Sequence, residues 1–458
     1  MAQGNHQGRL KMPKRIVIIG AHAAAVDAAS AARKTDRTAE ITLITNEKRA
    51  GYSRCGIPFV LGGHIPRFED LVVFPSTYYR MMKLDLRLET TATNINKEAK
   101  NINIQDKTGK QETLPYDSLI IATGASPFVP PMKGREKQGV YVVRTIEDGE
   151  RIDQAIKKAK SAVVVGAGLI GLETAVALAE RGLKTTVVEL LPYVLPVMLD
   201  EDMAKLVHNM LEEKGLRIIV GRAVDEILGA EKVAGVSVAG EEISADFVVV
   251  ATGIRINSEL AQKAGIAIGE TRGIKVNMRM ETSVKDIYAA GDCAESISLI
   301  TQRPTLSQLG TTAVKQGKVA GINAAGGYAI FTGVLGSAVS KMFDFEVGAT
   351  GLTEFFANRA GIATVTGSMT SKTRAEYYPG AQPIRVKIIV EKETQRIVGG
   401  QIVGGEEVTQ RINALSFAIQ KQMTVRELVK TDTCYAPPLS ETWEPMVLAA
   451  ETVLMKLR

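Results

Sequence analysis

The same arrangement of short segments occurs twice in this chain. In the first copy, an apolar strand at 14–20 ends in glycine, a helix rich in alanine follows at 23–34, and a second strand occupies 40–45. Residues 161–189 repeat this order. A strand, helix and strand within about 30 residues form a parallel β-α-β unit of the kind that binds dinucleotides. The repeat therefore predicts an α/β chain with two Rossmann-like modules.

Three further apolar strands indicate how the two modules are connected. Residues 119–124 and 247–253 each end in Ala-Thr-Gly, and each would add one strand to a module. A third strand, at 287–292, has no module of its own. We therefore expect the second module to be inserted into the first, giving two nested dinucleotide-binding modules.

The pattern changes after residue 330. Two strands at 385–390 and 397–403 predict an antiparallel pair, and residues 408–422 predict an amphipathic helix. These features indicate a C-terminal α+β domain. The predicted boundaries are a disordered polar tail at 1–13, a first module at 14–126 and 256–330, a second module at 127–255, and a third domain at 331–458.

Composition excludes several other classes of protein. The 458 residues carry 56 basic and 50 acidic side chains, and 45% of them are hydrophobic, as in globular proteins. Charges of both signs are mixed, which does not favour nucleic acid binding. The three cysteines are widely spaced and histidines do not cluster, so we expect no metal site. No apolar run reaches the ~18 residues of a membrane span, and no secretory signal is evident, which predicts a cytoplasmic protein.

The second module carries a complete Gly-x-Gly-x-x-Gly motif between strand and helix. Such glycines permit a tight turn, close approach of a pyrophosphate, and close packing of helix on strand. Glu189, at the end of the next strand, can accept hydrogen bonds from a ribose and would repel a 2′-phosphate, which favours NADH over NADPH. The predicted coenzyme-binding residues here are Gly166, Gly168, Ile170, Gly171, Glu173, Glu189 and Gly253.

The first module keeps only the first glycine of this motif, and small residues replace the others. Thr45 ends the second strand where an acid is expected and Glu47 follows closely, so either could meet a ribose, Glu47 having the better chemistry. A carboxylate at a strand end can also bind a sugar-like chain such as the ribityl of FAD. The predicted residues are Gly20, Ala24, Ala25, Glu47, Arg54, Ala122, Thr123, Gly124, Gly291 and Asp292.

Cys55 lies in the segment Tyr-Ser-Arg-Cys-Gly-Ile-Pro, where Pro58 suits the first turn of a helix. A position before a helix N-terminus, with Arg54 adjacent, would stabilise a thiolate. The alternative is a small buried hydrophobic residue, which is how most free cysteines behave. Cys293 and Cys434 have no basic neighbour and are predicted to be structural.

The two modules, the Ala-Thr-Gly turns, the sequence Cys-Gly-Ile-Pro at 55–58 and the segment 336–354 together resemble the pyridine nucleotide-disulfide oxidoreductase family. The resemblance is to its single-cysteine branch, which includes coenzyme A disulfide reductases, NADH oxidases, NADH peroxidases and polysulfide reductases. It implies FAD in the first module, NAD(P)H in the second, and a homodimer formed by the third domain.

The resemblance also implies site residues. Tyr377, Tyr378 and Tyr435 look like the tyrosines of coenzyme A disulfide reductase that lie near the cysteine, the last of them contributed by the partner chain. Catalysis would then use Cys55, Tyr378 and Tyr435. Arg33 and Lys34 match positions that bind the phosphates of coenzyme A, with a plain surface helix as the alternative, and Tyr377 is the third predicted substrate contact.

The activity implied is NADH-dependent reduction of a small disulfide or polysulfide through flavin and Cys55. Two alternatives stay open. In an NADH oxidase, Leu169 would replace the tyrosine that screens the flavin in many members and leave the ring open to oxygen. In an electron-transfer flavoprotein subunit, the acceptor would be another protein.

Overall fold

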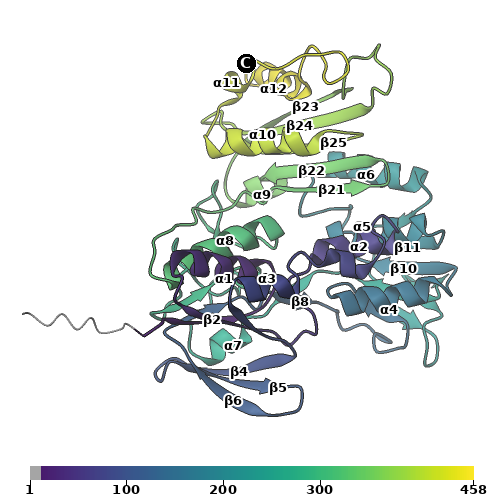
Figure 1. Cartoon of the computed structure of the whole chain (residues 1–458). Coiled ribbons are helices and arrows are strands. Elements are labelled where there is room, and N and C mark those ends of the chain that lie inside the picture. Colours follow the sequence, from purple (N-terminus) through teal and green to yellow (C-terminus); the bar gives the residue numbers. More distant parts are fainter. Residues whose placement is uncertain (1–11) are drawn as a thin grey trace, which may run out of the picture.

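Residues 12–458 are described by a computed structural model, shown in Figure 1. Nearly all of the predicted tail, residues 1–11, lies outside the described residues. The chain forms two α/β modules side by side, and an antiparallel domain lies above them in the figure. Within residues 12–458, no helix combines the length and apolar character needed to cross a bilayer.

The first module is a parallel sheet of five strands with α1 and α8 packed beside it. Three of its strands, at 15–19, 118–121 and 287–289, are short, apolar and almost fully buried, as expected for a parallel sheet covered on both faces, whereas the edge strand at 84–87 is partly exposed. The strand order is β18 (Ile287–Ala289), β7 (Ser118–Ile121), β1 (Arg15–Ile19), β2 (Glu40–Ile44) and β3 (Leu84–Arg87), and the helices are α1 (Ala23–Thr35) and α8 (Gly310–Ala324).

The second module repeats this design with its own parallel sheet and core. The strand order is β12 (Arg217–Ile219), β11 (Lys184–Val188), β10 (Ser161–Val165), β16 (Phe247–Val250) and β9 (Val140–Val142), and the helices are α4 (Ile146–Ile156), α5 (Leu169–Glu180) and α6 (Glu201–Glu213). Both predicted β-α-β units are therefore confirmed, with element ends within a few residues of those expected.

The nesting of the modules is visible in the strand order. β18 pairs in parallel with β7 of the first sheet, although the whole second module separates them in sequence. The two crossings between the modules run as an antiparallel pair, β8 (Ala125–Pro127) with β17 (Ile254–Ile256). The predicted insertion is confirmed, and the exact domain boundaries stay a prediction.

Smaller elements complete the two modules. One three-stranded sheet extends the first module at the bottom of Figure 1, and a second three-stranded sheet has its strands in the second module. These elements are β4 (Thr90–Asn96), β5 (Asn101–Asp106), β6 (Gln111–Pro115), β13 (Glu226–Leu228), β14 (Gly235–Val238), β15 (Glu241–Ser244), β19 (Ser296–Ile297), β20 (Pro304–Thr305), η1 (Arg54–Gly56), α2 (Ile57–Leu61), η2 (Phe68–Leu71), α3 (Ser76–Met81) and α7 (Glu259–Lys263).

The third domain is a five-stranded antiparallel sheet covered by helices, as predicted. The expected strand pair is β24 (Pro383–Glu391) with β25 (Ile397–Gly404), and a bulge interrupts its register at Ile389 and Val390. The strand order is β21 (Ala338–Met342), β22 (Phe345–Gly351), β25 (Ile397–Gly404), β24 (Pro383–Glu391) and β23 (Thr364–Lys372), and the helices are α9 (Glu354–Arg359), α10 (Val408–Gln420), α11 (Val425–Leu428) and α12 (Pro445–Lys456).

Helices α1 and α8 touch backbone to backbone because glycines of α8 face alanines of α1. A β-carbon at Gly317 would lie 2.1 Å from the carbonyl oxygen of Ala24, and one at Gly321 would lie 2.1 Å from that of Ala28. This spacing repeats every four residues on both helices, so one face of each is matched to the other. The contact fixes the start of α1 against the first sheet.

We expect Gly317→Ala to destabilise the fold by about 3 kcal/mol, because the added methyl group forces two helix backbones apart. Gly310→Ala, in the same helix, is the matched control, since a β-carbon there meets nothing within 4 Å. Urea unfolding of both variants measures the difference. Equal stabilities would contradict the close packing of α1 on α8.

Candidate active site

The two glycine turns have the same construction. A β-carbon at Gly20 would lie 2.3 Å from the carbonyl oxygen of Ala122, and one at Gly166 would lie 2.4 Å from that of Ala251. Both glycines have a positive φ, of 133° and 108°. Each module therefore folds its first strand directly against its Ala-Thr-Gly turn, which only glycine permits.

The second turn has the space expected of a dinucleotide cradle. A β-carbon at Gly168 or Gly253 would meet nothing within 4 Å, whereas one at Gly171 would lie 2.1 Å from the carbonyl oxygen of Gly166. Glu189 lies beside this turn, and its carboxylate accepts hydrogen bonds from the main-chain N–H of Ala167 (2.6 Å) and of Leu191 (2.8 Å). The predicted motif residues are thus brought together, and Ile170 is exposed at the start of α5.

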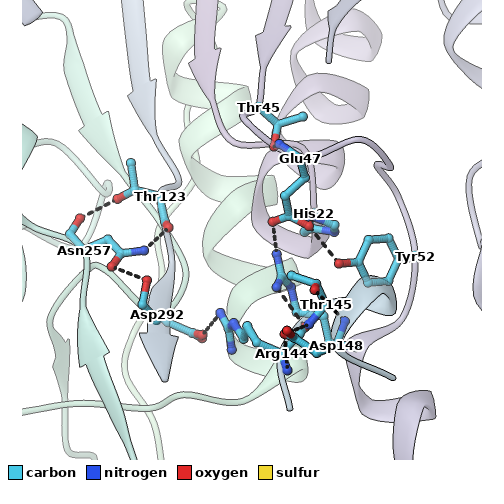
Figure 2. Close-up of polar contacts among 12 residues, drawn as sticks. His22, Thr45, Glu47, Tyr52, Thr123, Arg144, Thr145, Asp148, Asn257 and Asp292 are labelled. Atoms are coloured by element: carbon cyan, nitrogen blue, oxygen red, sulfur yellow. Dashed lines mark hydrogen bonds and ion pairs between the residues drawn. The ribbon is translucent and has the colours of Figure 1, made fainter. Parts of the chain in front are cut away.

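The Ala-Thr-Gly turn of the first module is closed by Asn257, which the sequence analysis did not identify. The Asn257 side chain donates to the carbonyl of Thr123 (3.0 Å), and the Thr123 hydroxyl donates to the carbonyl of Asn257 (2.6 Å). These contacts join the two crossings between the modules (Figure 2). The main-chain N–H of Asn257 also donates to the carbonyl of Gly124 (3.0 Å), which ties this turn to the returning crossing.

Asp292 forms an ion pair with Arg144 (3.1 Å), and both side chains are more than four-fifths buried. Arg144 precedes α4, whose N-terminus is fixed by a capping box between Thr145 and Asp148. Burial lowers the pKa of Arg144, and the charge of Arg54 lowers it further. Gly291, before Asp292, lies close to Ala24 at the start of α1. The small residue at position 24 therefore allows α1 to pack closely on the turn that carries Asp292.

Glu47 makes more hydrogen bonds within the protein than the sequence predicts. Its carboxylate accepts hydrogen bonds from Tyr52 (2.7 Å) and Arg54, and it lies 3.0 Å from the ring of His22. Burial tends to raise the pKa of Glu47, but the hydrogen bond from His22 and the charge of Arg54 lower it to about 2. Figure 2 shows this cluster beside Thr45. Glu47 is therefore an ionised group whose two oxygens both accept hydrogen bonds from the protein, and its contact with a ribose stays a prediction.

Cys55 lies in the turn η1 directly before α2, with Pro58 in the first turn of that helix as predicted. The residue is exposed, which excludes the alternative of a buried hydrophobic cysteine; Cys434 is also exposed and Cys293 is buried. The guanidinium of Arg54 donates to the carboxylate of Glu47 and to the carbonyl of Arg144, and its charge is not among the causes that shift the pKa of Cys55. Desolvation by the surrounding protein raises the pKa of the Cys55 thiol, and the negative charge of Glu173 raises it further. The positive charge of Arg144 lowers it. The expected stabilisation of a thiolate by Arg54 is therefore corrected.

Glu173 connects the second module to the third domain. Its carboxylate accepts a hydrogen bond from the hydroxyl of Ser340 in β21 (2.7 Å), and burial raises its pKa. Because Glu173 also acts on the pKa of Cys55, the α5 helix and the cysteine turn belong to one site.

The predicted tyrosines lie on loops of the third domain. The hydroxyls of Tyr377 and Tyr435 are 2.9 Å apart, and their hydrogen bond raises the pKa of Tyr377. Both are exposed, as is Tyr378. In Figure 1 these loops lie at the far end of the third domain from α2, so one chain does not bring them to its own Cys55.

The two basic residues predicted to bind coenzyme A differ in their surroundings. Lys34 is exposed at the end of α1. Arg33 instead donates to main-chain carbonyls, which corrects its predicted role from a phosphate ligand to a residue that holds neighbouring segments together. Its four acceptors are Met82, Arg37, Ala39 and Lys83, at 2.7–2.9 Å.

The first module fits a bound flavin coenzyme in one further respect. Nδ1 of His22 and Nε of Arg144 are buried without a hydrogen-bond partner among residues 12–458. Buried polar atoms are normally satisfied, and these two lie next to the glycine turn and to Asp292. Both would gain a partner from a polar ligand lying along the carboxyl ends of the strands.

Arg144 and Tyr52 are the main residues that the sequence analysis missed. For Arg144 a signal existed, because the sequence Thr-Ile-Glu-Asp that follows it is a capping box and therefore predicts a helix N-terminus. For Tyr52 the only sequence signal was its nearness to Cys55. Its hydrogen bond to Glu47 depends on the conformation of the loop between them, which the sequence does not reveal.

Comparison with known proteins agrees with this geometry. The family pattern of pyridine nucleotide-disulphide oxidoreductases matches residues 14–317, and that of their dimerisation domain matches residues 337–447. A protein of Methanocaldococcus jannaschii described as NADH oxidase is 48% identical, over 97% of this chain and 99% of its own length. A protein of Pyrococcus abyssi described as NAD(P)H sulfur oxidoreductase (CoA-dependent) is 34% identical, with 97% and 99% covered.

Among solved structures, a NAD-dependent persulfide reductase from A. fulgidus superposes with a TM-score of 0.94 at 41% identity, covering 96% of this chain and 83% of that one. Sequence and structure thus agree over nearly the whole length, including both modules and the third domain. The chain is a member of the pyridine nucleotide-disulphide oxidoreductase family, and it is an NAD(P)H-dependent oxidoreductase.

Proposed function

We propose that this protein is an FAD-dependent NADH oxidoreductase that reduces a small disulfide or polysulfide through Cys55. The observation that carries the proposal is the exposed thiol of Cys55, on a turn whose helix α2 packs against α5 of the second module. Glu173, Arg144 and Asp292 all lie near enough to act on its pKa. The Pyrococcus abyssi relative and the A. fulgidus structure are described as acting on sulfur compounds, which supports a sulfur acceptor.

When bound, FAD supplies two-electron transfer between NADH and the thiol centre. The chain's own part begins with Cys55, whose thiolate attacks one sulfur of the substrate, forming a mixed disulfide and releasing a thiolate. Arg144 favours the ionised form of Cys55, while Glu173 and Asp292 oppose it. The released thiolate needs a proton, and we assign Tyr435 or Tyr378 of a partner chain to donate it.

We assign the residues around each glycine turn to the coenzymes. Gly20, Asp292 and Arg144 would hold FAD, and Gly168 offers the open backbone that NADH requires. Glu189 lies beside the second turn and forms no ion pair with another residue of the described range 12–458, so it would repel the 2′-phosphate of NADPH. NADH is therefore the proposed donor.

The substrate disulfide is proposed to be that of coenzyme A or a polysulfide. Lys34 is exposed on α1 and can bind a phosphate, and Tyr377 lies in hydrogen-bond contact with Tyr435. A homodimer would bring this tyrosine pair to the cysteine of the other chain, which a single chain cannot do for itself. The matched dimerisation domain supports such an assembly.

A second candidate is an NADH oxidase, in which Cys55 alternates between thiolate and sulfenate. The description of the Methanocaldococcus jannaschii relative favours it. So does Leu169, which is only partly buried at the start of α5.

An anaerobic titration separates the candidates. We expect the purified protein to be yellow, to bleach on addition of NADH, and to regain colour with coenzyme A disulfide or polysulfide while thiol or sulfide forms. Recovery with oxygen alone, yielding peroxide or water, would favour the oxidase. A colourless protein that does not bind added FAD would contradict both.

A further inference from the structure

His22 lies at the first glycine turn, directly before α1. Only one of its two ring nitrogens has a hydrogen-bond partner within residues 12–458. Nε2 lies 3.0 Å from a carboxylate oxygen of Glu47. Nδ1 is buried and has no partner among residues 12–458. Buried polar atoms in folded proteins normally have a hydrogen-bond partner. Nδ1 of His22 thus lacks a polar partner that a bound ligand could supply.

The protonation of the ring follows from its partner. Glu47 is ionised at neutral pH, so it accepts the hydrogen of Nε2, and the neutral ring then carries no proton on Nδ1. Burial lowers the pKa of His22, the hydrogen bond to Glu47 opposes this, and the charges of Arg54 and Arg144 add to the lowering. Nδ1 is therefore a bare acceptor in the ligand-free chain.

The charged groups that face His22 come from four segments. Glu47 follows β2, Tyr52 packs edge-on against the ring at 4.6 Å, and Arg54 belongs to η1. Arg144 precedes α4 and is paired with Asp292 after β18. The two arginines balance the two carboxylates, so the cluster is neutral when His22 is neutral. An added anion would make the cluster negative and would therefore raise the pKa of His22, which favours the protonated ring.

The N-terminus of α1 is where such an anion would dock. Its first main-chain N–H groups have no partner inside the helix, and no side chain caps them. A glycine turn followed by a helix of 13 residues is the arrangement that holds a dinucleotide pyrophosphate. His22 lies between that helix end and the carboxylate of Glu47.

We propose that His22 takes up one proton at Nδ1 when the pyrophosphate of FAD docks at α1, and that it then donates a hydrogen bond to this ligand. The proton comes from solvent, Nε2 keeps its hydrogen bond to Glu47, and neutral imidazole becomes imidazolium. The inference rests on the proposed binding of FAD in the first module.

Proton uptake gives the flavin affinity a characteristic pH dependence. Between the pKa of His22 in the free chain, which lies below 6.5, and its higher pKa in the complex, the dissociation constant of FAD should rise about tenfold per pH unit. Outside that window the dissociation constant should be flat. Glu47 and the two arginines keep their charge at neutral pH, so they do not produce this slope.

The test is calorimetric titration of the full chain, freed of flavin, with FAD in buffers of different ionisation heat. About one proton should be taken up near neutral pH, and His22→Asn should abolish both the uptake and the slope. His64→Asn is the matched control, because His64 also pairs with a carboxylate, Glu180 at 2.8 Å, but is exposed. It should behave as the parent.

Nitrogen-15 NMR of the four histidines in the parent chain tests the same point without any substitution at His22, should that variant fail to fold. One ring should gain a proton at Nδ1 on addition of FAD. FAD binding with no proton uptake and an unchanged ring would overturn the inference alone. Failure to bind FAD at any pH would overturn the proposed function instead.

Discussion

Replacing Cys55 with serine should lower disulfide or polysulfide turnover about a thousandfold or more, because serine cannot form the mixed disulfide at neutral pH. Reduction of the bound flavin by NADH should be unaffected, since it does not need the thiol. Stopped-flow bleaching of flavin absorbance measures the first half of the reaction, and thiol release measures the second. A loss confined to the second half would locate the defect at Cys55.

Cys434→Ser is the matched control, because Cys434 is the other exposed cysteine and lies in the third domain. It should retain the activity of the parent. Full turnover of Cys55→Ser with disulfide would contradict the thiol mechanism. Full turnover of that variant with a protein acceptor would instead support the electron-transfer alternative.

The fold could be predicted from the sequence because its information is local. The strand at 15–19, its terminal glycine and the helix that follows are specified by neighbouring residues, and the same holds for the second copy. The insertion also followed from sequence, since the lone strand at 287–289 could pair only with a sheet already begun. Backbone requirements could also be predicted, because the positive φ of Gly20 and Gly166 favours glycine at those positions.

The side chains of the site were harder to predict because their partners are distant in sequence. Arg33 binds the carbonyls of Met82 and Lys83, some 50 residues away, and a helix position alone cannot reveal this. Glu47 was expected to face a ribose, yet it is engaged by three side chains that fold around it. The charge beside Cys55 likewise depends on Arg144, which comes from another segment altogether.

Replacing each of the two glycines at the start of α5 with alanine should have a different effect: one variant should lose stability and the other should lose only coenzyme affinity. In Gly171→Ala the new β-carbon would lie 2.1 Å from the carbonyl oxygen of Gly166, so the helix must move off the strand. We expect a loss of about 3 kcal/mol in the free energy of unfolding, together with loss of NADH binding. Urea unfolding with and without NADH measures both effects.

Gly168→Ala should leave the fold intact and impair only the coenzyme. Gly168 has an ordinary φ of −74°, and its β-carbon would meet no protein atom within 4 Å. The methyl group would instead occupy the space through which a pyrophosphate approaches the backbone. Overpacking by a methyl group costs about 1–3 kcal/mol, so the dissociation constant of NADH should rise about tenfold to a hundredfold at unchanged stability. Unaltered NADH affinity in this variant would mean that the coenzyme does not lie over the second glycine turn.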